Sequence, residues 1–315
     1  MQDTTPNTAA RPAPAVGAGG RRILVIRLGA LGDFVLSFGP FAAIRARHAF
    51  AEITLLTTAP FADLARRAPW FDRVAVDARP SWGNLPGLLR LARQVRGFDA
   101  AYDLQTSARS ARYFRLAGRP PWSGIAPGCS HPHANPRRDF MHTLERQREQ
   151  LAMAGVSAFP EPDLSWLAGR AFDLPHPYAL LVPGAAPHRP AKRWPAERYR
   201  ELAERLRGRG VTPVVLGSGA EAPLAAAIPA AIDLTGQTTL ADIATLARGA
   251  AVAVGNDTGP MHLIAAVGCP SVVLFSAESD PALTAPRGPG GAWPTVLRVP
   301  DLADLPVERV AASLA

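Results

Sequence analysis

The chain has 315 residues, of which 48% are hydrophobic and 19% are charged. This length suits two domains of ordinary size, and this composition excludes a mainly disordered protein. The formal net charge of +8 favours anionic partners, but the arginines are spread among alanines and prolines without a dense basic run, so we expect no nucleic acid among them.

The N-terminal residues and the cysteines indicate the cellular compartment of the protein. Residues 1–20 lack the continuous apolar stretch of a signal peptide and are typical of a disordered tail. Cys129 and Cys269 have neither C-x-x-C nor zinc-finger spacing, which indicates free thiols in a reducing compartment. The pair His131 and His133 lies among prolines and glycines, which favours a loop over a metal site. We therefore predict a cytoplasmic protein.

The first half alternates short apolar strands with helical segments. Ile23–Ile26 is an apolar, β-branched run, which Gly29 and Gly32 interrupt before helical spacing begins. Further strands are expected in EITLLTT, DRVAVD and FDAAYDLQ, and further helices in FADLARRAP, LPGLLRLARQVRG and SARSARYFRLAG. Such alternation predicts a parallel sheet covered by helices.

The pattern loosens between about Pro120 and Pro177, where HTLERQREQLAMAG is one clear helix, and then resumes. Strands are expected in YALLVPG, TPVVLGSG, AVAVGN and PSVVLFS, with the helices PAERYRELAERLRGRG, AEAPLAAAI, LADIATLARGA and PMHLIAAVG around them. We predict an α/β protein with two Rossmann-like domains, residues 21–160 and 178–315, joined by a linker over 161–177. The two domains would face each other across a cleft that holds the ligand.

The turn RLGALGD, residues 27–33, is the first candidate site. Its glycines are spaced G-x-x-G, whereas a dinucleotide fingerprint is G-x-G-x-x-G, so a dinucleotide site is poorly supported. Asp33 stands at the start of the following helix. It can cap that helix, or it can accept a proton from a substrate hydroxyl at the mouth of the cleft, and the sequence leaves both roles open.

The segment VGNDTGPMHLIAAVGCP predicts a strand, a turn and a helix. Asp257 or Thr258 can cap this helix. The free amides of Thr258 and Gly259, together with the positive end of the helix dipole, suit a phosphate or diphosphate. His262 lies in the first turn and could reach the same ligand. The alternative is an ordinary capped turn with a structural histidine.

Lys192 is the only lysine among 34 lysine and arginine residues. Lysine is a compact point charge, whereas arginine is a planar fork. Lys192 lies near the end of LLVPGAAPHRPAKRWP, a strand followed by a glycine-containing loop. It could hold a diphosphate against the NDTG turn, or it could be a solvated loop charge. Glu221 in LGSGAEAP could bond a ribose hydroxyl or cap a helix. The chain lacks the D-x-D spacing of a usual metal bridge to a nucleotide-sugar.

Several segments, in this order, resemble the glycosyltransferase family that contains the ADP-heptose:lipopolysaccharide heptosyltransferases, glycosyltransferase family 9. They are ILVIRLGALGDFVL, LLVPGAAPHRPAKRWPAERY, TPVVLGSGAE, DLTGQTTLADIATLARGAAVAVGNDTGPMHLIAAVGCPSVVLF and SAESDPALTAP. The resemblance implies a GT-B fold and transfer with inversion, without a metal or other cofactor. The N-terminal domain would take a glycolipid or oligosaccharide acceptor, and the C-terminal domain a nucleotide-sugar donor, with ADP-heptose favoured.

The same resemblance implies roles for individual residues. Asp33 resembles the catalytic base, and Lys192 resembles the lysine that contacts the donor phosphate. Glu221 resembles the acidic residue near the donor ribose. Asp257, Thr258 and Gly259 resemble the loop that binds the donor phosphate. His262 lies beside this loop.

One departure and two alternatives accompany this interpretation. Ala185 and Ala186 stand where the family often offers a serine or threonine hydroxyl. The first alternative is a nicotinamide-dependent oxidoreductase on the same Rossmann halves, against which the G-x-x-G spacing argues. The second is a non-catalytic nucleotide-sugar-binding protein, in which Asp33 is only a cap. The net charge would also suit peripheral contact with an anionic glycolipid at the inner face of the cytoplasmic membrane.

Overall fold

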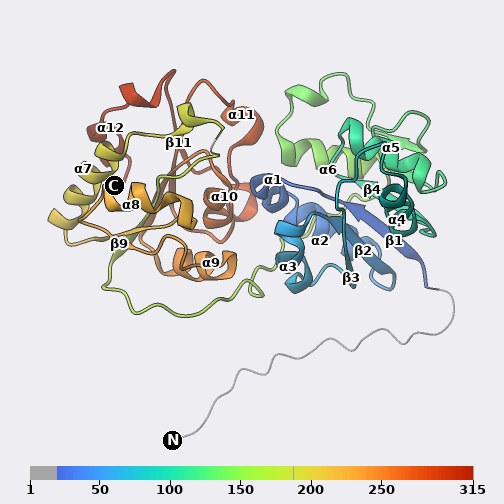
Figure 1. The fold of residues 1–315 in the computed structure, drawn as a ribbon, viewed down its shortest axis with the longest axis horizontal. Helices are drawn as coiled ribbons and strands as arrows, with labels where there is room; N and C mark the ends of the chain where they lie inside the picture. Colours follow the sequence, from blue (N-terminus) through green and yellow to red (C-terminus); the bar gives the residue numbers. More distant parts are fainter. Residues whose placement is uncertain (1–19, 187, 315) are drawn as a thin grey trace, which may run out of the picture.

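The computed structural model describes residues 20–186 and 188–314, so the predicted tail, apart from Gly20, lies outside the described residues. Figure 1 shows two α/β halves side by side, with the N-terminal half in blue to green and the C-terminal half in yellow to red. Within the described part of the chain, no helix has the length and apolar character needed to cross a membrane.

Each half contains one six-stranded parallel sheet. The N-terminal sheet has the order β3-β2-β1-β4-β5-β6, with β1 (Arg22–Ile26), β2 (Glu52–Thr57), β3 (Arg73–Val76), β4 (Ala100–Asp103), β5 (Trp122–Gly124) and β6 (His131–Pro132). The C-terminal sheet has the order β12-β11-β10-β7-β8-β9, with β7 (Tyr178–Val182), β8 (Thr212–Val215), β9 (Ile232–Asp233), β10 (Val252–Asn256), β11 (Ser271–Phe275) and β12 (Thr295–Arg298). Counted from its own first strand, each sheet has the Rossmann order 3-2-1-4-5-6. The predicted fold class is confirmed.

Helices cover both faces of each sheet. The N-terminal half carries α1 (Leu31–Leu36), α2 (Phe38–Arg47), α3 (Ala59–Arg67), α4 (Leu85–Val95), α5 (Ala108–Leu116) and α6 (Thr143–Met153). The C-terminal half carries α7 (Ala196–Gly208), α8 (Ala222–Ala226), α9 (Leu240–Gly249), α10 (Gly259–Ala266), α11 (Pro281–Thr284) and α12 (Val307–Ala312).

The central strand β1 divides its side chains between two cores. Ile23 and Val25 join the apolar cluster that includes residues of α1, α2 and α3, whereas Leu24 and Ile26 join the cluster under α4 and α5. This alternation follows from the pleat, which points successive side chains to opposite faces. Burial on both faces explains why the strand is apolar throughout.

The sequence missed the shortest elements. β5 and β6 lie in the stretch where the pattern loosens, and β9, β12 and α12 were not predicted. Strands of two or three residues, as in β5, β6 and β9, are too short for alternation to be recognised. Residues 161–177 contain no helix or strand, and Leu164, Trp166 and Phe172 pack against the main core. The division into domains at these residues stays a prediction.

Two glycines let α1 and α10 meet between the halves. A Cβ on Gly32 of α1 would lie 2.7 Å from Nε2 of His262, and a Cβ on Gly259 of α10 would lie 2.7 Å from Cβ of Leu31. Real Cβ atoms do not approach other atoms so closely. The contact between the halves therefore depends on the absence of side chains at these two positions, and Figure 1 shows α1 and α10 facing each other.

We expect Gly259→Ala to lower the free energy of unfolding by about 1–3 kcal/mol, the usual cost of overpacking, because Cβ of Leu31 cannot rotate away. Gly39→Ala in α2 is the matched control, because a Cβ there meets nothing within 4 Å; it should leave stability unchanged or raise it by up to about 1 kcal/mol. Urea unfolding of both variants measures the difference. Equal stabilities would contradict the close contact.

Candidate active site

The strand order of each sheet reverses next to its first strand, between β1 and β4 and between β7 and β10. Open α/β sheets bind ligands at such points, beyond the carboxyl ends of the strands. The loops after β1 and β10 lead directly into α1 and α10, the two helices that meet between the halves. The two reversal points therefore face one another.

Two adjoining cavities open at this place. The first, of about 390 Å³, is lined by Ala30, Gly32, Asp33, Ala186, Arg189, Lys192, Asp257, Thr258, Gly259, His262, Ser279 and Thr284. The second, of about 370 Å³, is lined by Val182, Gly184, Ala185, Ala186, Leu216, Gly217, Ser218, Glu221, Thr238, Leu240, Ile243, Thr258 and Pro260. Ala186 and Thr258 line both. All seven predicted site residues lie in this pair of cavities.

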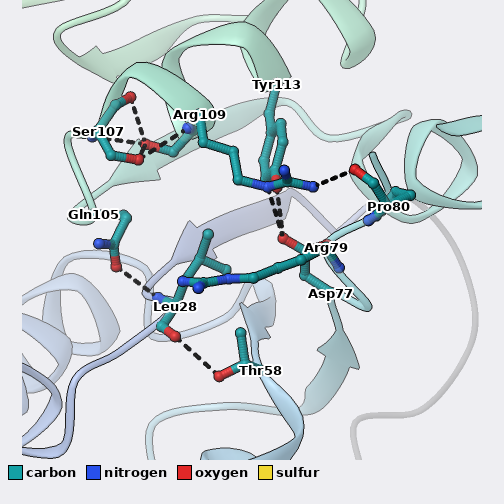
Figure 2. Close-up of polar contacts among 10 residues, drawn as sticks. Leu28, Thr58, Asp77, Arg79, Pro80, Gln105, Ser107, Arg109 and Tyr113 are labelled. Atoms are coloured by element: carbon teal, nitrogen blue, oxygen red, sulfur yellow. Dashed lines mark hydrogen bonds and ion pairs between the residues drawn. The ribbon is translucent and has the colours of Figure 1, made fainter. Parts of the chain in front are cut away.

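The loop between β1 and α1 is fixed to its neighbours. The N–H of Leu28 donates to Oε1 of Gln105 at 2.8 Å, and its carbonyl accepts from Oγ1 of Thr58 at 2.9 Å (Figure 2). The loop is thus tied to the residues that follow β4 and β2. This anchoring holds the start of α1, and with it Asp33, in place.

Asp33 is paired with a buried arginine. Nη2 of Arg27 lies 3.1 Å from Oδ1 of Asp33, and Nη1 donates to the carbonyl of Leu104 at 2.5 Å. The Arg27 side chain is 3% exposed and that of Asp33 is 39% exposed, so Asp33 can be reached from the cavity and Arg27 cannot. Burial lowers the pKa of Arg27, and the charge of Asp33 opposes this shift. Arg27 is a positioning residue that the sequence did not reveal.

The interpretation of Asp33 as an N-cap is wrong. The helix begins at Leu31 and its N-cap is Ala30, so Asp33 lies within the first turn. The helix dipole favours a carboxylate in the first turn even when that carboxylate does not cap the helix. Its side chain is therefore available for the pairing with Arg27 and for the cavity.

On the opposite side of the cavity, Lys192 is paired with Asp257. Nζ of Lys192 lies 2.5 Å from Oδ2 of Asp257, which also accepts from Oγ of Ser279 at 2.6 Å. The lysine and aspartate side chains are 13% and 8% exposed. Lys192 is therefore not a solvated loop charge. Ser279 is a partner that the sequence did not reveal.

The start of α10 opens into the same cavity. Thr258 is its N-cap, although the threonine side chain accepts no hydrogen bond from a helix N–H, so Asp257 is not the cap. The first N–H groups of a helix lack intrahelical partners, and the dipole makes this end positive. Lys192, Arg189 and the α10 terminus thus bring positive potential to one wall of the cavity.

A buried asparagine holds the two C-terminal loops together. Oδ1 of Asn256 accepts from the N–H of Trp194 and from the hydroxyl of Tyr199, both at 3.1 Å, and its Nδ2 donates to the carbonyl of Pro183 at 2.8 Å. The loop after β7 is therefore tied to the end of β10. This bonding explains how Lys192 and Asp257, 65 residues apart in sequence, meet.

His262 lies between the two charged pairs. Its side chain is buried, with Nδ1 lacking a hydrogen-bond partner among the described residues, and Nε2 lies against Gly32. Burial lowers its pKa to about 4, although the charges of Asp257 and Asp33 oppose the shift. The imidazole is therefore neutral at neutral pH and packs the contact between the halves.

Glu221 has one of its two predicted roles, the capping role, and the contact with a ribose hydroxyl stays a prediction. Its Oε2 accepts from the N–H of Ser218 at 2.8 Å and from the Ser218 hydroxyl at 2.5 Å, which closes a capping box. Oε1 forms no hydrogen bond within the described residues, and the side chain lines the second cavity. One oxygen thus remains for a ligand.

The stretch from Cys129 to His133 lies apart from these cavities. Both cysteines of the chain are free and buried. His133 is also buried, and its Nε2 lies 3.4 Å from Oε2 of Glu149. Among residues 20–186 and 188–314, no group of three or more histidine, cysteine, aspartate or glutamate residues is arranged to hold a metal ion.

A comparison with known protein families identifies the family of this chain. The family model described as glycosyltransferase family 9 (heptosyltransferase) matches residues 88–292. The chain belongs to this family. As a family 9 glycosyltransferase it is an enzyme, which decides against the oxidoreductase and the non-catalytic binding protein.

Relatives of this glycosyltransferase match most of its length. Lipopolysaccharide heptosyltransferase 1 of Pseudomonas aeruginosa is 28% identical over 294 residues, which cover 85% of this chain and 81% of the relative. Lipopolysaccharide heptosyltransferase 2 of Salmonella typhimurium is 28% identical over 300 residues, which cover 84% and 85%. The solved Escherichia coli ADP-heptose lipopolysaccharide heptosyltransferase II is 25% identical, with a TM-score of 0.71 over 93% of this chain and 97% of that one.

A second solved structure shares the fold alone. The Escherichia coli heptosyltransferase WaaC with ADP is 20% identical to this chain, with a TM-score of 0.72 over 92% of this chain and 98% of that one. The two-sheet architecture is thus common to enzymes of widely different sequence.

The buried imidazole makes stability depend on pH. Because the pKa of His262 is about 4 in the folded glycosyltransferase and about 6.5 in the unfolded chain, the unfolded chain binds more protons between these values. The free energy of unfolding should therefore fall as the pH falls from about 6.5 to 4, by up to about 3 kcal/mol from this group.

His262→Gln should remove this part of the pH dependence, whereas His131→Gln, which changes an exposed histidine, should keep it. Urea unfolding of both variants and the wild type at a series of pH values measures the slopes. A wild-type slope in His262→Gln would show that the imidazole is not held neutral by burial.

Proposed function

We propose that this enzyme transfers heptose from ADP-heptose to a lipopolysaccharide-core glycan, with inversion at the anomeric carbon and without a metal ion. The relatives' names support heptose transfer to lipopolysaccharide, and the similarity to the solved ADP-heptose lipopolysaccharide heptosyltransferase II supports ADP-heptose as the donor. The observation that carries the proposal is that Asp33 from one half and Lys192 from the other line the same cavity.

Asp33 is the base in this proposal. An acceptor hydroxyl gives its proton to the carboxylate while its oxygen forms a bond to the anomeric carbon. The bond from that carbon to the diphosphate oxygen breaks at the same time, and its electron pair leaves with the nucleoside diphosphate. Attack from the side opposite the leaving group inverts the configuration. Arg27 orients the carboxylate from behind, at 3.1 Å.

The leaving diphosphate meets the positive wall of the cavity. Lys192 and the amides at the start of α10 are preorganised donors, and such electrostatic stabilisation is usually the largest contribution to catalysis. Asp257 carries the same sign of charge as a phosphate, so we assign it to holding Lys192 rather than to touching the donor. The enzyme itself then supplies the charge that a metal ion supplies elsewhere.

The second cavity suits the nucleoside. Leu216, Leu240 and Ile243 give it an apolar lining for a base, and the unpaired Oε1 of Glu221 can accept from a ribose hydroxyl. Ala186 lies at the junction of the two cavities, where the diphosphate must pass. Because Ala186 has no hydroxyl to donate a hydrogen bond, Lys192 and the α10 amides make the phosphate contacts in this proposal.

Asp33→Asn should lower kcat by about 10²–10⁴-fold, the usual contribution of a general base, and leave ADP affinity unchanged. Asp63→Asn is the matched control, because Asp63 is an exposed carboxylate on α3 that pairs with Arg66. Release of ADP in the presence of ADP-heptose and an acceptor oligosaccharide measures the rate. Normal turnover by Asp33→Asn would rule out this base.

Lys192→Ala should weaken ADP binding by roughly 10–100-fold, because a charged hydrogen bond to phosphate is lost. Lys192→Arg should keep part of the affinity, since it retains the charge but not its compact shape. Calorimetric titration with ADP, UDP, GDP and NADH, each with and without EDTA, measures this. Affinity for ADP that EDTA abolishes would refute metal independence, and a preference for UDP or GDP would refute ADP-heptose.

A further inference from the structure

The positive charge of the chain is concentrated in one part of the N-terminal half. Residues 78–138 contain ten arginines and two aspartates, which gives this segment a formal charge of +8. Basic and acidic residues are equal in number in the rest of the chain, so this segment accounts for the whole formal net charge. One of the two aspartates, Asp103, is completely buried. The arginines form no dense run here either, and the excess of positive charge arises because acidic residues are scarce in this segment.

Apolar side chains are exposed within this basic segment. Leu85 and Leu89 lie four residues apart on one side of α4, and their side chains are 65% and 52% exposed. Trp82, in the loop just before α4, is 39% exposed. Three large apolar side chains thus project from one short segment, although α4 also buries Leu91 and Val95 against the sheet.

Arginines surround these apolar side chains. Arg90 and Arg93 are exposed on α4 itself. The neighbouring helix α5 exposes Arg112, and the guanidinium of Arg112 lies 4.9 Å from the centre of the Trp82 ring. None of these three guanidiniums forms an ion pair within the described residues. Neither helix contains an aspartate or a glutamate.

The loop that carries Trp82 is held rigidly. Nη2 of Arg109 donates to the carbonyl of Pro80 at 2.8 Å, and its Nε donates to the hydroxyl of Tyr113 at 2.6 Å (Figure 2). The hydroxyl of Tyr113 donates in turn to Oδ2 of Asp77 at 2.5 Å. The loop between β3 and α4 is thus fixed to α5, and Trp82 is presented in one place.

Arg79 in this loop has a left-handed backbone, with a φ of 50°. A non-glycine residue in this region costs energy and persists where its surroundings hold it. Here its N–H donates to Oδ1 of Asp77 at 2.7 Å. The strained conformation is therefore built into the loop.

We propose that this face docks on a membrane surface that bears anionic lipid headgroups. We call it the α4–α5 face; it consists of Trp82, Leu85, Leu89, Arg90, Arg93 and Arg112. Tryptophan and leucine insert at the boundary between headgroups and acyl chains, while arginines around them pair with anionic headgroups. Duplex nucleic acid would engage the arginines but would leave the leucines exposed.

The position of the face suits an enzyme that works on a membrane glycolipid. Figure 1 shows α4 and α5 on the side of the N-terminal half that lies away from the C-terminal half, so docking leaves the cleft free. The Trp82 loop follows β3 at the carboxyl edge of the sheet, the edge that also carries Asp33. The inference rests on the proposed function only in taking the acceptor to be a glycolipid.

Sedimentation with vesicles of phosphatidylcholine, with and without phosphatidylglycerol, tests the proposal on the full chain. The wild type should bind the anionic vesicles and release them as salt is raised. Trp82→Ser/Leu85→Gln/Leu89→Gln and Arg90→Gln/Arg93→Gln/Arg112→Gln should each lower the partition coefficient at least about tenfold. The control Arg200→Gln/Arg209→Gln/Arg309→Gln removes three exposed arginines of the C-terminal half and should bind as the wild type does.

ADP titration of the wild type and of the same variants separates this proposal from the proposed function. A wild type that binds ADP but not the anionic vesicles would overturn the membrane face and leave the transferase in place. A wild type that binds the vesicles but not ADP would overturn the proposed donor and leave the membrane face in place. Both triple variants should bind ADP as the wild type does. Three other outcomes would also overturn the membrane face: equal loss in the control, retention by duplex DNA that only the arginine variant lowers, or self-association that only the apolar variant abolishes.

Discussion

The packing of α1 against α10 is the constraint on which the rest of the site depends. Gly32 and Gly259 let two helices from separate sheets approach until His262 and Leu31 fill the space that side chains would occupy. The apolar cluster is consequently continuous between the halves, with Phe34 and Leu263 in one core. A cavity wall from each half is thereby set at a fixed distance, which a loose pair of domains would not provide.

Each wall of the cavity contains one ion pair, and the proposed functional group is the negative partner in one wall and the positive partner in the other. In the N-terminal half a buried arginine holds the carboxylate of Asp33, and in the C-terminal half a carboxylate holds the ammonium of Lys192. In the first pair Asp33 faces the cavity and Arg27 supports it from behind, whereas Lys192 and Asp257 both line the cavity. The supported charge is therefore oriented before a ligand arrives, which lowers the cost of reorganisation during the reaction.

The sequence predicted the larger elements and the loops that carry the site, because long periodic strands and helices and glycine turns are local signals. It could not reveal Arg27, Asn256 or Ser279, whose roles arise only from contacts between distant segments. A charged or amide residue at the carboxyl end of an apolar strand, as at Arg27 after β1 and Asn256 at the end of β10, was the available signal. The α4–α5 face was missed because helix packing, not sequence proximity, brings Arg112 to Trp82.

The single lysine makes one position in the candidate site selectively reactive toward amine reagents. Lys192 is the only ε-amine in the sequence, and it lies in the candidate site. Reagents that acylate amines have, besides the chain terminus, only this one target. Because the ammonium is held by Asp257 and largely buried, the acylation rate reports directly on whether that pair is intact or open. Ordinary lysine labelling thus becomes a site-specific probe without any mutation.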